Sequence, residues 1–380
     1  MDMKRIRKIA SVLIAAFLFS YALLRAVEIK ITVNGSVLPI SALWGAVLAT
    51  CLTGAICVVW QVVAENRQKE RIRGLFGTHV SAVLVERMVK EGKDPALGGH
   101  EVELTAYFSD VQSFAVFSET LTTSRLIELM NEYLTACTDI VQQEGGTLDK
   151  YIGGAIVAMF GAPVALPDHA CRACVAAHRV QLRLGELSAK WRSEGAKWPG
   201  SVSGMRSRIG LNSGPCVVGN MGSRTRFNYT MMGANVSLAS RMESGAGSWG
   251  VFSMCTEATR AACLQHGGDR VVFRPLGRVG VMGHAQPVPI HEIVGLKESI
   301  ASTTRECIGI FQQGLTRYLA RDWTGAIALF HESARLESLS PDRTPGVKTN
   351  PSLIYIELCR HYQEEPPPEK WDGIYVLREK

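Results

Sequence analysis

Residues 147–160 read TLDKYIGGAIVAMF, and the predicted domain is organised around this stretch. Two runs with the character of β-strands flank Gly153 and Gly154, a pattern that predicts a β-hairpin with a tight turn. A second stretch, YFSDVQSF at residues 107–114, ends an apolar run in Asp110 and then begins a helical pattern. An acid at the end of a strand, followed by the free N–H groups of a helix, suits a cation and the phosphates bound to it. Taken alone, such an acid is more often the N-cap of the helix.

Strand and helix patterns alternate on both sides of this hairpin, between residues 101 and 295. The order predicts an α+β domain of the ferredoxin-like βαββαβ type, with an antiparallel sheet and helices on one face. The predicted elements are a strand at 102–108, a helix at 124–144 closed by two glycines, strands at 147–152 and 155–160, a helix at 169–187 and a strand at 205–212.

Two apolar segments without charged residues, 9–24 and 31–64, precede this domain. The second is long enough for a membrane helix with an interfacial lead-in, since about 20 apolar residues span the hydrocarbon. Basic residues flank both outer ends, which favours cytoplasmic termini. The pattern predicts a membrane hairpin over residues 1–64, in the inner or plasma membrane, with the rest of the chain in the cytoplasm. The first segment is also consistent with a signal sequence.

The segments on either side of the predicted domain are helical in character. Residues 65–100 read as an amphipathic helix followed by a Gly-rich linker; this helix either forms a parallel dimer stalk or packs on its own domain. Residues 298–380 form a helical tail in which 322–334 resembles one tetratricopeptide-like unit. A single unit of this kind cannot bury its apolar face, so the tail must dock on the preceding domain or on a partner.

The net charge is +6, and the basic residues do not form one basic face on the predicted domain. Many of them flank the two apolar segments. This distribution favours a membrane surface and argues against nucleic acid as a partner. The ten cysteines are scattered. Cys171 and Cys174 have CxxC spacing but lie in an alanine-rich helical pattern without a second pair, which indicates reduced thiols and not a metal or redox site.

Five motifs within residues 101–297 resemble, in order and spacing, those of the class III nucleotidyl cyclases, most closely bacterial membrane-bound adenylate cyclases. They are FSDVQSF at 108–114, KYIGGAIVAMFGAP at 150–163, RIGLNSG at 208–214, NYTMMG at 228–233 and LASRME at 238–243. The resemblance implies a catalytic domain that converts ATP into 3′,5′-cyclic AMP and pyrophosphate in signal transduction. Such chemistry relies on positioning and on neutralisation of charge, which two Mg²⁺ or Mn²⁺ ions supply in this family.

The resemblance assigns metal and phosphate binding to the first two motifs. Asp110 is one of two metal-bridging acids, and the Val111 carbonyl is a further metal ligand. The backbone amides of Gln112, Ser113 and Phe114 receive the terminal phosphates.

Base recognition and charge stabilisation fall to the later motifs. Lys150 and Thr230 contact the purine and favour ATP, since lysine donates to adenine N1 whereas guanine has a donor there. Arg241 stabilises charge on the reacting phosphate. In this family one subunit supplies the metal acids and its partner supplies the purine-reading and arginine groups, so a homodimer has two equivalent sites.

Three positions depart from the family pattern. Gly154 replaces the second metal acid, Ser237 replaces an asparagine that orients the ribose, and Met282 replaces a phosphate-binding lysine, with His284 two residues on. Asp149 does not take the place of the missing acid. The chain is therefore a cyclase, an impaired homologue with a regulatory role, or one half of a heterodimer; a scaffold acting through the tail is a further alternative.

Overall fold

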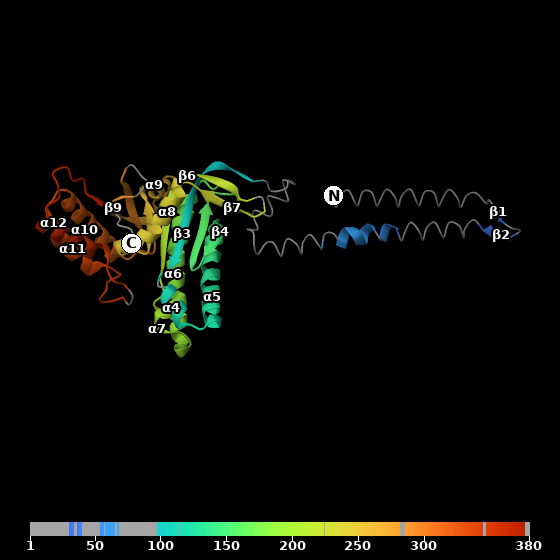
Figure 1. The fold of residues 1–380 in the computed structure, drawn as a ribbon, viewed down its shortest axis with the longest axis horizontal. Helices are drawn as coiled ribbons and strands as arrows, with labels where there is room; N and C mark the ends of the chain where they lie inside the picture. Colours follow the sequence, from blue (N-terminus) through green and yellow to red (C-terminus); the bar gives the residue numbers. More distant parts are fainter. Residues whose placement is uncertain are drawn as a thin grey trace. The chain divides into compact units, whose positions relative to one another are not determined.

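The computed structural model describes residues 30–33, 36–39, 54–56, 58–64, 67, 97–112, 114–223, 225–281, 286–344 and 347–376 (Figure 1). The chain divides into two compact units, Met1–Val85 and Glu86–Lys380.

Within the first unit, β1 (Lys30–Val33) pairs with β2 (Ser36–Pro39) as an antiparallel hairpin. No strand was predicted from the sequence in this region. Residues 54–56 and 58–64 are helical. Most of the two predicted membrane spans, and all of the predicted stalk helix except Arg67, lie outside the described residues. In the part of the chain that is described, no helix is long and apolar enough to cross a membrane.

The second unit contains the predicted βαββαβ order. The strands are β3 (Gly98–Val111), β4 (Thr147–Ile152), β5 (Ala155–Phe160) and β6 (Ser207–Gly222), and the crossing helices are α5 (Thr123–Gln143) and α6 (His169–Ser193). These strands lie in the antiparallel order β6-β3-β5-β4. The fold class of this domain is thus confirmed, and the hairpin at Gly153 and Gly154 has the predicted bounds. Strands β3 and β6 are longer than expected.

One face of the sheet packs against α5 and α6. Alternate residues along β3 and β5, such as Tyr107, Ile156 and Phe160, join Tyr133 of α5 and Trp191 of α6 in one buried cluster. Figure 1 shows both helices running along the sheet. The period-2 alternation of the strands therefore meets the apolar stripes of two long helices.

The opposite face is covered as well, contrary to the prediction of helices on one face only. There, Leu104 and Met159 of the sheet share a cluster with Ala239 of α8 (Ala234–Ala246) and Met231 of β7 (Phe227–Met232). Helix α8 lies very close to β6, because a Cβ atom at Gly210 would be 2.0 Å from the backbone nitrogen of Glu243. Glycine at this position is therefore a condition for the packing of α8.

Further strands extend the sheet to nine, in the order β11-β9-β10-β8-β6-β3-β5-β4 with β7 paired to β6. The pairs β6–β8 and β9–β11 are parallel, so the sheet is mixed and not purely antiparallel. The remaining elements of this region are α4 (Phe114–Thr120), η1 (Gly195–Lys197), α7 (Gly200–Ser203), η2 (Gly247–Trp249), β8 (Ser253–Thr256), α9 (Glu257–Gly267), η3 (Gly268–Arg270), β9 (Val271–Gly280), β10 (Val288–Leu296) and β11 (Ile374–Val376).

The helical tail consists of α10 (Ser302–Leu319), α11 (Trp323–Leu336), α12 (Pro351–Glu364) and β11. Asp322 and Asn350 cap α11 and α12 by accepting hydrogen bonds from backbone amides. The tail lies at the β9 end of the sheet (Figure 1) and shares a buried cluster with α8, β9 and β10. The tail was predicted to dock either on the preceding domain or on a partner, and in this structure it docks on the preceding domain.

The CxxC cysteines have neighbours that the sequence did not reveal. Cys171 and Cys174 of α6 form thiol hydrogen bonds with Cys263 of α9, and Cys174 also with Cys255 of β8. All four are buried free thiols. The contact with Cys263 and burial raise the pKa of Cys171, and burial and the contact with Cys255 raise the pKa of Cys174, so both thiols stay protonated.

Candidate active site

Asp110, the predicted metal acid, lies one residue before the end of β3 and opposite Arg208 of β6. Nη2 of Arg208 is 3.3 Å from Oδ2 of Asp110, and its Nε is 3.1 Å from Oε1 of Glu243 on α8. One guanidinium thus joins the predicted metal acid to α8. Burial raises the pKa of Glu243 to about 7; Arg208 lowers it and Asp110 raises it further. No role was predicted from the sequence for Arg208 or Glu243.

The turn at Gly153 and Gly154 brings position 154 to Asp110. A Cβ atom at Gly154 would be 3.6 Å from Oδ1 of Asp110, 3.4 Å from Cβ of Val111 and 3.3 Å from the ring of Phe114. Gly153 has φ of 60°, whereas Gly154 is not in the left-handed region. An acid at position 154 therefore needs a small shift of the Phe114 ring but no unusual backbone.

The donor set at this place does not fit a pair of metal ions. It offers the Asp110 carboxylate and the Val111 carbonyl, and Arg208 holds one carboxylate oxygen. Mg²⁺ and Mn²⁺ prefer several oxygen ligands, and a bridged pair of ions needs carboxylates at both positions. Among the described residues, no group of three or more His, Cys, Asp or Glu side chains is placed to hold a metal ion.

The backbone amides that were predicted to bind phosphate differ in their surroundings. The Gln112 amide donates to the carbonyl of Arg206 at 2.8 Å, so it already has a hydrogen-bond partner in this structure, and its assignment to a phosphate stays a prediction. This bond forms because hydrogen bonding to the chain around β6 continues one residue beyond β3. The Phe114 amide opens α4, and Ser113 lies outside the described residues.

Lys150 and Thr230, the predicted purine readers, are brought together from β4 and β7. Nζ of Lys150 donates to Oγ1 of Thr230 at 3.2 Å. Thr230 in turn donates to Oδ2 of Asp149 at 2.5 Å, and Nζ of Lys150 is 3.4 Å from Oδ1 of Asp149. The Asp149 side chain is 1% exposed and that of Lys150 40% exposed. Burial raises the pKa of Asp149, while Thr230 and Lys150 oppose this rise.

The role of Asp149 was missed because neighbouring residues of a regular strand point to opposite faces. The β4–β5 register shifts between Leu148 and Lys150, which is a β-bulge at Asp149. The bulge lets Asp149 and Lys150 both contact Thr230. The sequence shows only an acid next to a lysine in a predicted strand. The bulge that brings both side chains to Thr230 results from the pairing of β4 with β5 and is not visible in the sequence.

Ser237 and Arg241 lie one turn apart on α8 and therefore on the same side of this helix. Ser237 is exposed and Arg241 is partly exposed. Asn235, Ala239 and Glu243 occupy the side that meets β6: Asn235 accepts a hydrogen bond from Asn212, and Glu243 pairs with Arg208. Met282, at the position where the resemblance implies a lysine, and His284 fall outside the described residues.

Comparisons with known proteins show the family of this domain. Residues 100–291 match the family model of the adenylate and guanylate cyclase catalytic domain, which is about half of the chain. The chain belongs to this family. The match contains Asp110, Gly154, Lys150, Thr230 and Arg241, and it identifies the domain as a nucleotidyl cyclase catalytic domain.

Individual relatives are consistent with the family. Adenylate cyclase 1 of Rhizobium meliloti (strain 1021) is 31% identical over 240 residues, which are 63% of this chain and 34% of that protein. The adenylyl cyclase CyaB from P. aeruginosa is 30% identical, with 54% of this chain and 100% of that chain covered and a TM-score of 0.47. A bacterial light-regulated adenylyl cyclase is 22% identical, with 63% and 65% covered and a TM-score of 0.51, which supports the fold. This chain thus spans about a third of the length of the Rhizobium relative.

Proposed function

We propose that this chain is the ATP-recognising half of a class III adenylate cyclase. It would act in a dimer whose second chain supplies an intact pair of metal acids. In the reaction the ribose 3′-oxygen forms a bond to the α-phosphorus, the bond from that phosphorus to the pyrophosphate oxygen breaks, and cyclic AMP and pyrophosphate leave. The observation that carries the proposal is the contrast between the assembled Lys150–Thr230 pair and the missing acid at Gly154.

The Lys150–Thr230 pair supports ATP as the nucleotide. Nζ of Lys150 has three N–H donors, and among the described residues its partners are Thr230 and Asp149. The third donor suits the N1 acceptor of adenine, whereas the N1 position of guanine carries a hydrogen and repels a donor. Asp149 accepts from Thr230, which fixes the direction of the Thr230 hydroxyl and leaves its oxygen as an acceptor. That oxygen suits the 6-amino group of adenine.

Arg241 supplies the second contribution of this chain. A guanidinium holds phosphate oxygens with a planar fork, and charge on these oxygens grows as the reaction proceeds. Arg241 lies on α8. This helix is joined to β6 by close packing at Gly210 and by the Arg208–Glu243 ion pair. Arg241 therefore stands on a well-anchored helix.

Gly154 argues against efficient turnover by the homodimer. Each of the two sites would have one carboxylate where the family has two. Arg208, moreover, places a positive charge 3.3 Å from the remaining one. A heterodimer avoids this defect, because the acids of its productive site come from the other chain.

A complementation experiment tests the proposal. The first chain is the natural one, which has Arg241 but no acid at position 154. The second carries Gly154→Asp together with Arg241→Ala, so it has both acids but lacks the arginine. The two chains are co-expressed with different tags, purified as heterodimers through both tags, and assayed with Mn²⁺ and ATP. Only the heterodimer contains a site with both acids and Arg241, so it should exceed either homodimer at least tenfold.

The remaining outcomes separate the alternatives. If the natural homodimer turns over as fast as a Gly154→Asp homodimer, the chain is a competent cyclase alone and the half-site proposal fails. If the Gly154→Asp homodimer is active but the heterodimer is silent, the natural chain does not complete a partner's site. If every combination is silent, Ser237 and Met282 outweigh the restored acid, and a non-catalytic regulatory role is favoured.

The proposal includes the membrane hairpin over residues 1–64, with the cyclase domain on the cytoplasmic side. Its support is the sequence pattern of two uncharged segments with basic outer flanks. Alkaline carbonate extraction of cell membranes tests it: an integral hairpin stays in the pellet, whereas recovery of the chain in the supernatant contradicts the membrane part of the proposal.

A further inference from the structure

Helix α8 has three sides with different neighbours. One side, with Ala239 and Glu243, packs on β6. A second side contributes Leu238, Met242 and Ala246 to the buried cluster that also contains the tail helices. The third side carries Ser237 and Arg241. The tail thus packs on the helix that presents the predicted catalytic arginine.

The C-terminal end of α8 is held by the start of α12. Gly250, directly after η2, has φ of 64°, and a Cβ atom there would lie 2.7 Å from Cα of Asn350 and 2.8 Å from the carbonyl oxygen of Thr349. The rings of Trp249 and Tyr355 pack with centroids 5.7 Å apart and both are buried. A shift of α12 would therefore move the end of α8.

Tyr355 also fixes an irregularity in β9. The β9–β10 register shifts between Ile290 and His291, so that Leu276 bulges out of the ladder. The Tyr355 hydroxyl donates to the Leu276 carbonyl at 2.7 Å, and it would lie 2.4 Å from a Cβ atom at Gly277, where φ is 106°. Strand β9 leads directly into the segment with position 282, and β11 pairs along its last residues. The tail therefore stabilises the conformation of the hairpin formed by β9 and β10.

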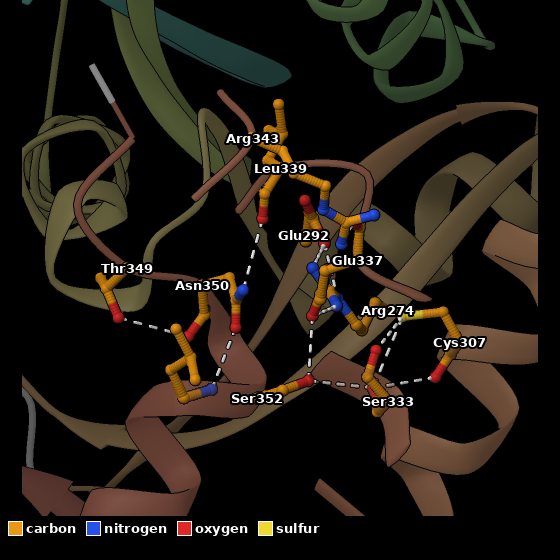
Figure 2. Close-up of polar contacts among 11 residues, drawn as sticks. Arg274, Glu292, Cys307, Ser333, Glu337, Leu339, Arg343, Thr349, Asn350 and Ser352 are labelled. Atoms are coloured by element: carbon orange, nitrogen blue, oxygen red, sulfur yellow. Dashed lines mark hydrogen bonds and ion pairs between the residues drawn. The ribbon is translucent and has the colours of Figure 1, made fainter. Parts of the chain in front are cut away.

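A buried charge network joins the same elements (Figure 2). Nη1 of Arg274 on β9 donates to Glu337 after α11 at 2.6 Å, and its Nε donates to Glu292 on β10 at 2.7 Å. Ser352 of α12 donates to the same Glu337 oxygen at 3.0 Å and lies 2.9 Å from Ser333 of α11. The Arg274 side chain is 6% exposed. This network ties the tail helices to the hairpin with directional contacts.

We propose that the helical tail is a built-in brace of the catalytic site, and that Trp249 and Tyr355 are positioning residues for Arg241. The brace holds α8 through Trp249 and Gly250, and holds the β9–β10 hairpin through Tyr355 and Arg274. The inference rests on the proposed function, because it concerns the half of the site that contains Arg241. Lys150 and Thr230 stand on β4 and β7, and neither strand contributes a residue to the buried cluster that contains the tail helices.

Amide hydrogen exchange on the full chain tests the brace without any turnover. Tyr355→Phe removes the hydroxyl that caps the Leu276 carbonyl and keeps the ring against Trp249. Loss of such a buried hydrogen bond should raise the exchange rates of α8 and β9 amides about tenfold, while those of β4 and β5 stay unchanged. Tyr362→Phe is the matched control, since Tyr362 lies on the same helix but contacts Trp323 and Trp371. Equal exchange in the two variants overturns the brace.

The heterodimer assay shows whether the brace acts through Arg241. Tyr355→Phe in the natural chain, whose Arg241 serves the productive site, should lower kcat about tenfold with the KM for ATP unchanged. The same substitution in the chain that already carries Gly154→Asp and Arg241→Ala should have no effect. A merely structural role of Tyr355 would reduce activity equally from either chain, and that result, or no effect from either, overturns the positioning role.

The heterodimer assay and the hydrogen-exchange experiment distinguish a failure of the proposed function from a failure of the brace. A heterodimer that is silent before Tyr355 is changed contradicts the proposed function. In that case hydrogen exchange alone decides the brace: faster exchange confined to α8 and β9 supports it, and unchanged exchange contradicts it.

Discussion

Position 154 faces Asp110: a Cβ atom on Gly154 would lie 3.6 Å from Oδ1 of that carboxylate. Gly154→Asp should therefore give two adjacent carboxylates that bind Mn²⁺, detected by titration calorimetry or by the loss of the free-ion electron spin resonance signal. A metal pair contributes several kcal/mol to transition-state stabilisation. Since each 1.36 kcal/mol is tenfold in rate, homodimer turnover with Mn²⁺ and ATP should rise about 100-fold or more.

The neighbouring glycine provides the control for this substitution. Gly153 has φ of 60° and has no atom within 4 Å of its Cβ position, so Gly153→Asp places the same charge on the turn but away from Asp110. Aspartate tolerates this conformation better than most residues. Equal Mn²⁺ binding by the two variants would show that the added charge, and not the position facing Asp110, is responsible.

The contact between Lys150 and Thr230 leads to a prediction about nucleotide choice. Lys150→Glu with Thr230→Cys replaces a donor to the purine N1 position by an acceptor, which suits guanine. In the Gly154→Asp background, the ratio of kcat/KM for ATP over GTP should fall at least tenfold. Competition between the two nucleotides in one reaction measures this ratio directly. Retained ATP selectivity would contradict the assignment of these two residues to the purine.

Asp149 should matter through Thr230 and Lys150 and not through a metal ion. Asp149→Ala leaves the Thr230 hydroxyl and the Lys150 ammonium without this acceptor, and loss of one partner of a buried hydrogen bond costs about 1–3 kcal/mol. We expect a lower unfolding temperature and weaker discrimination between ATP and GTP. Asp149→Asn keeps an oxygen acceptor and should retain most of both properties. If the asparagine variant is as impaired as the alanine variant, the negative charge itself is required.

The sequence was sufficient for the parts of the fold with local signals. The turn at Gly153 and Gly154, the strands beside it and the starts of α5 and α6 were predicted to within a few residues, because periodicity and glycine placement are local properties. The placement of α8 on the second face of the sheet was not predicted. It depends on Gly210, a position whose importance is visible only once β6 and α8 are in contact.

The candidate site divides in the same manner. Asp110, Lys150, Thr230 and Arg241 were found through motifs of a known family. Asp149, Arg208 and Glu243 were missed, because their contacts result from a bulge in β4 and from the pairing of β3 with β6. The same limit applies to the pair of Arg274 and Glu337, which are distant in sequence and adjacent only after the tail has docked.

Glu243 should give the folded chain a pH dependence of known sign. Its pKa of about 7 in the folded state exceeds its ordinary value of 4.5, so between these pH values the folded chain binds more protons than the unfolded chain. The free energy of unfolding should therefore fall as the pH rises through this window, by at most about 1.4 kcal/mol per pH unit. Glu243→Gln should flatten this slope, whereas Glu357→Gln, at an exposed position, should not. Chemical unfolding between pH 4.5 and 8 measures it, and identical slopes would contradict the shifted pKa.

Arg274 should be the most sensitive charged residue at the junction between the tail and the hairpin. Arg274→Met leaves the carboxylates of Glu292 and Glu337 buried without their cation, and breaking a buried ion pair in this way costs about 3–5 kcal/mol. The variant should unfold at a clearly lower temperature and lose the tail to limited proteolysis first. Arg360→Met is the control, because its pair with Glu357 is exposed and such pairs contribute about 0–1 kcal/mol. Adding Glu292→Leu and Glu337→Leu to Arg274→Met removes the unpaired charges and should recover most of the loss. If Arg274→Met alone unfolds like the control, the buried network does not hold the tail.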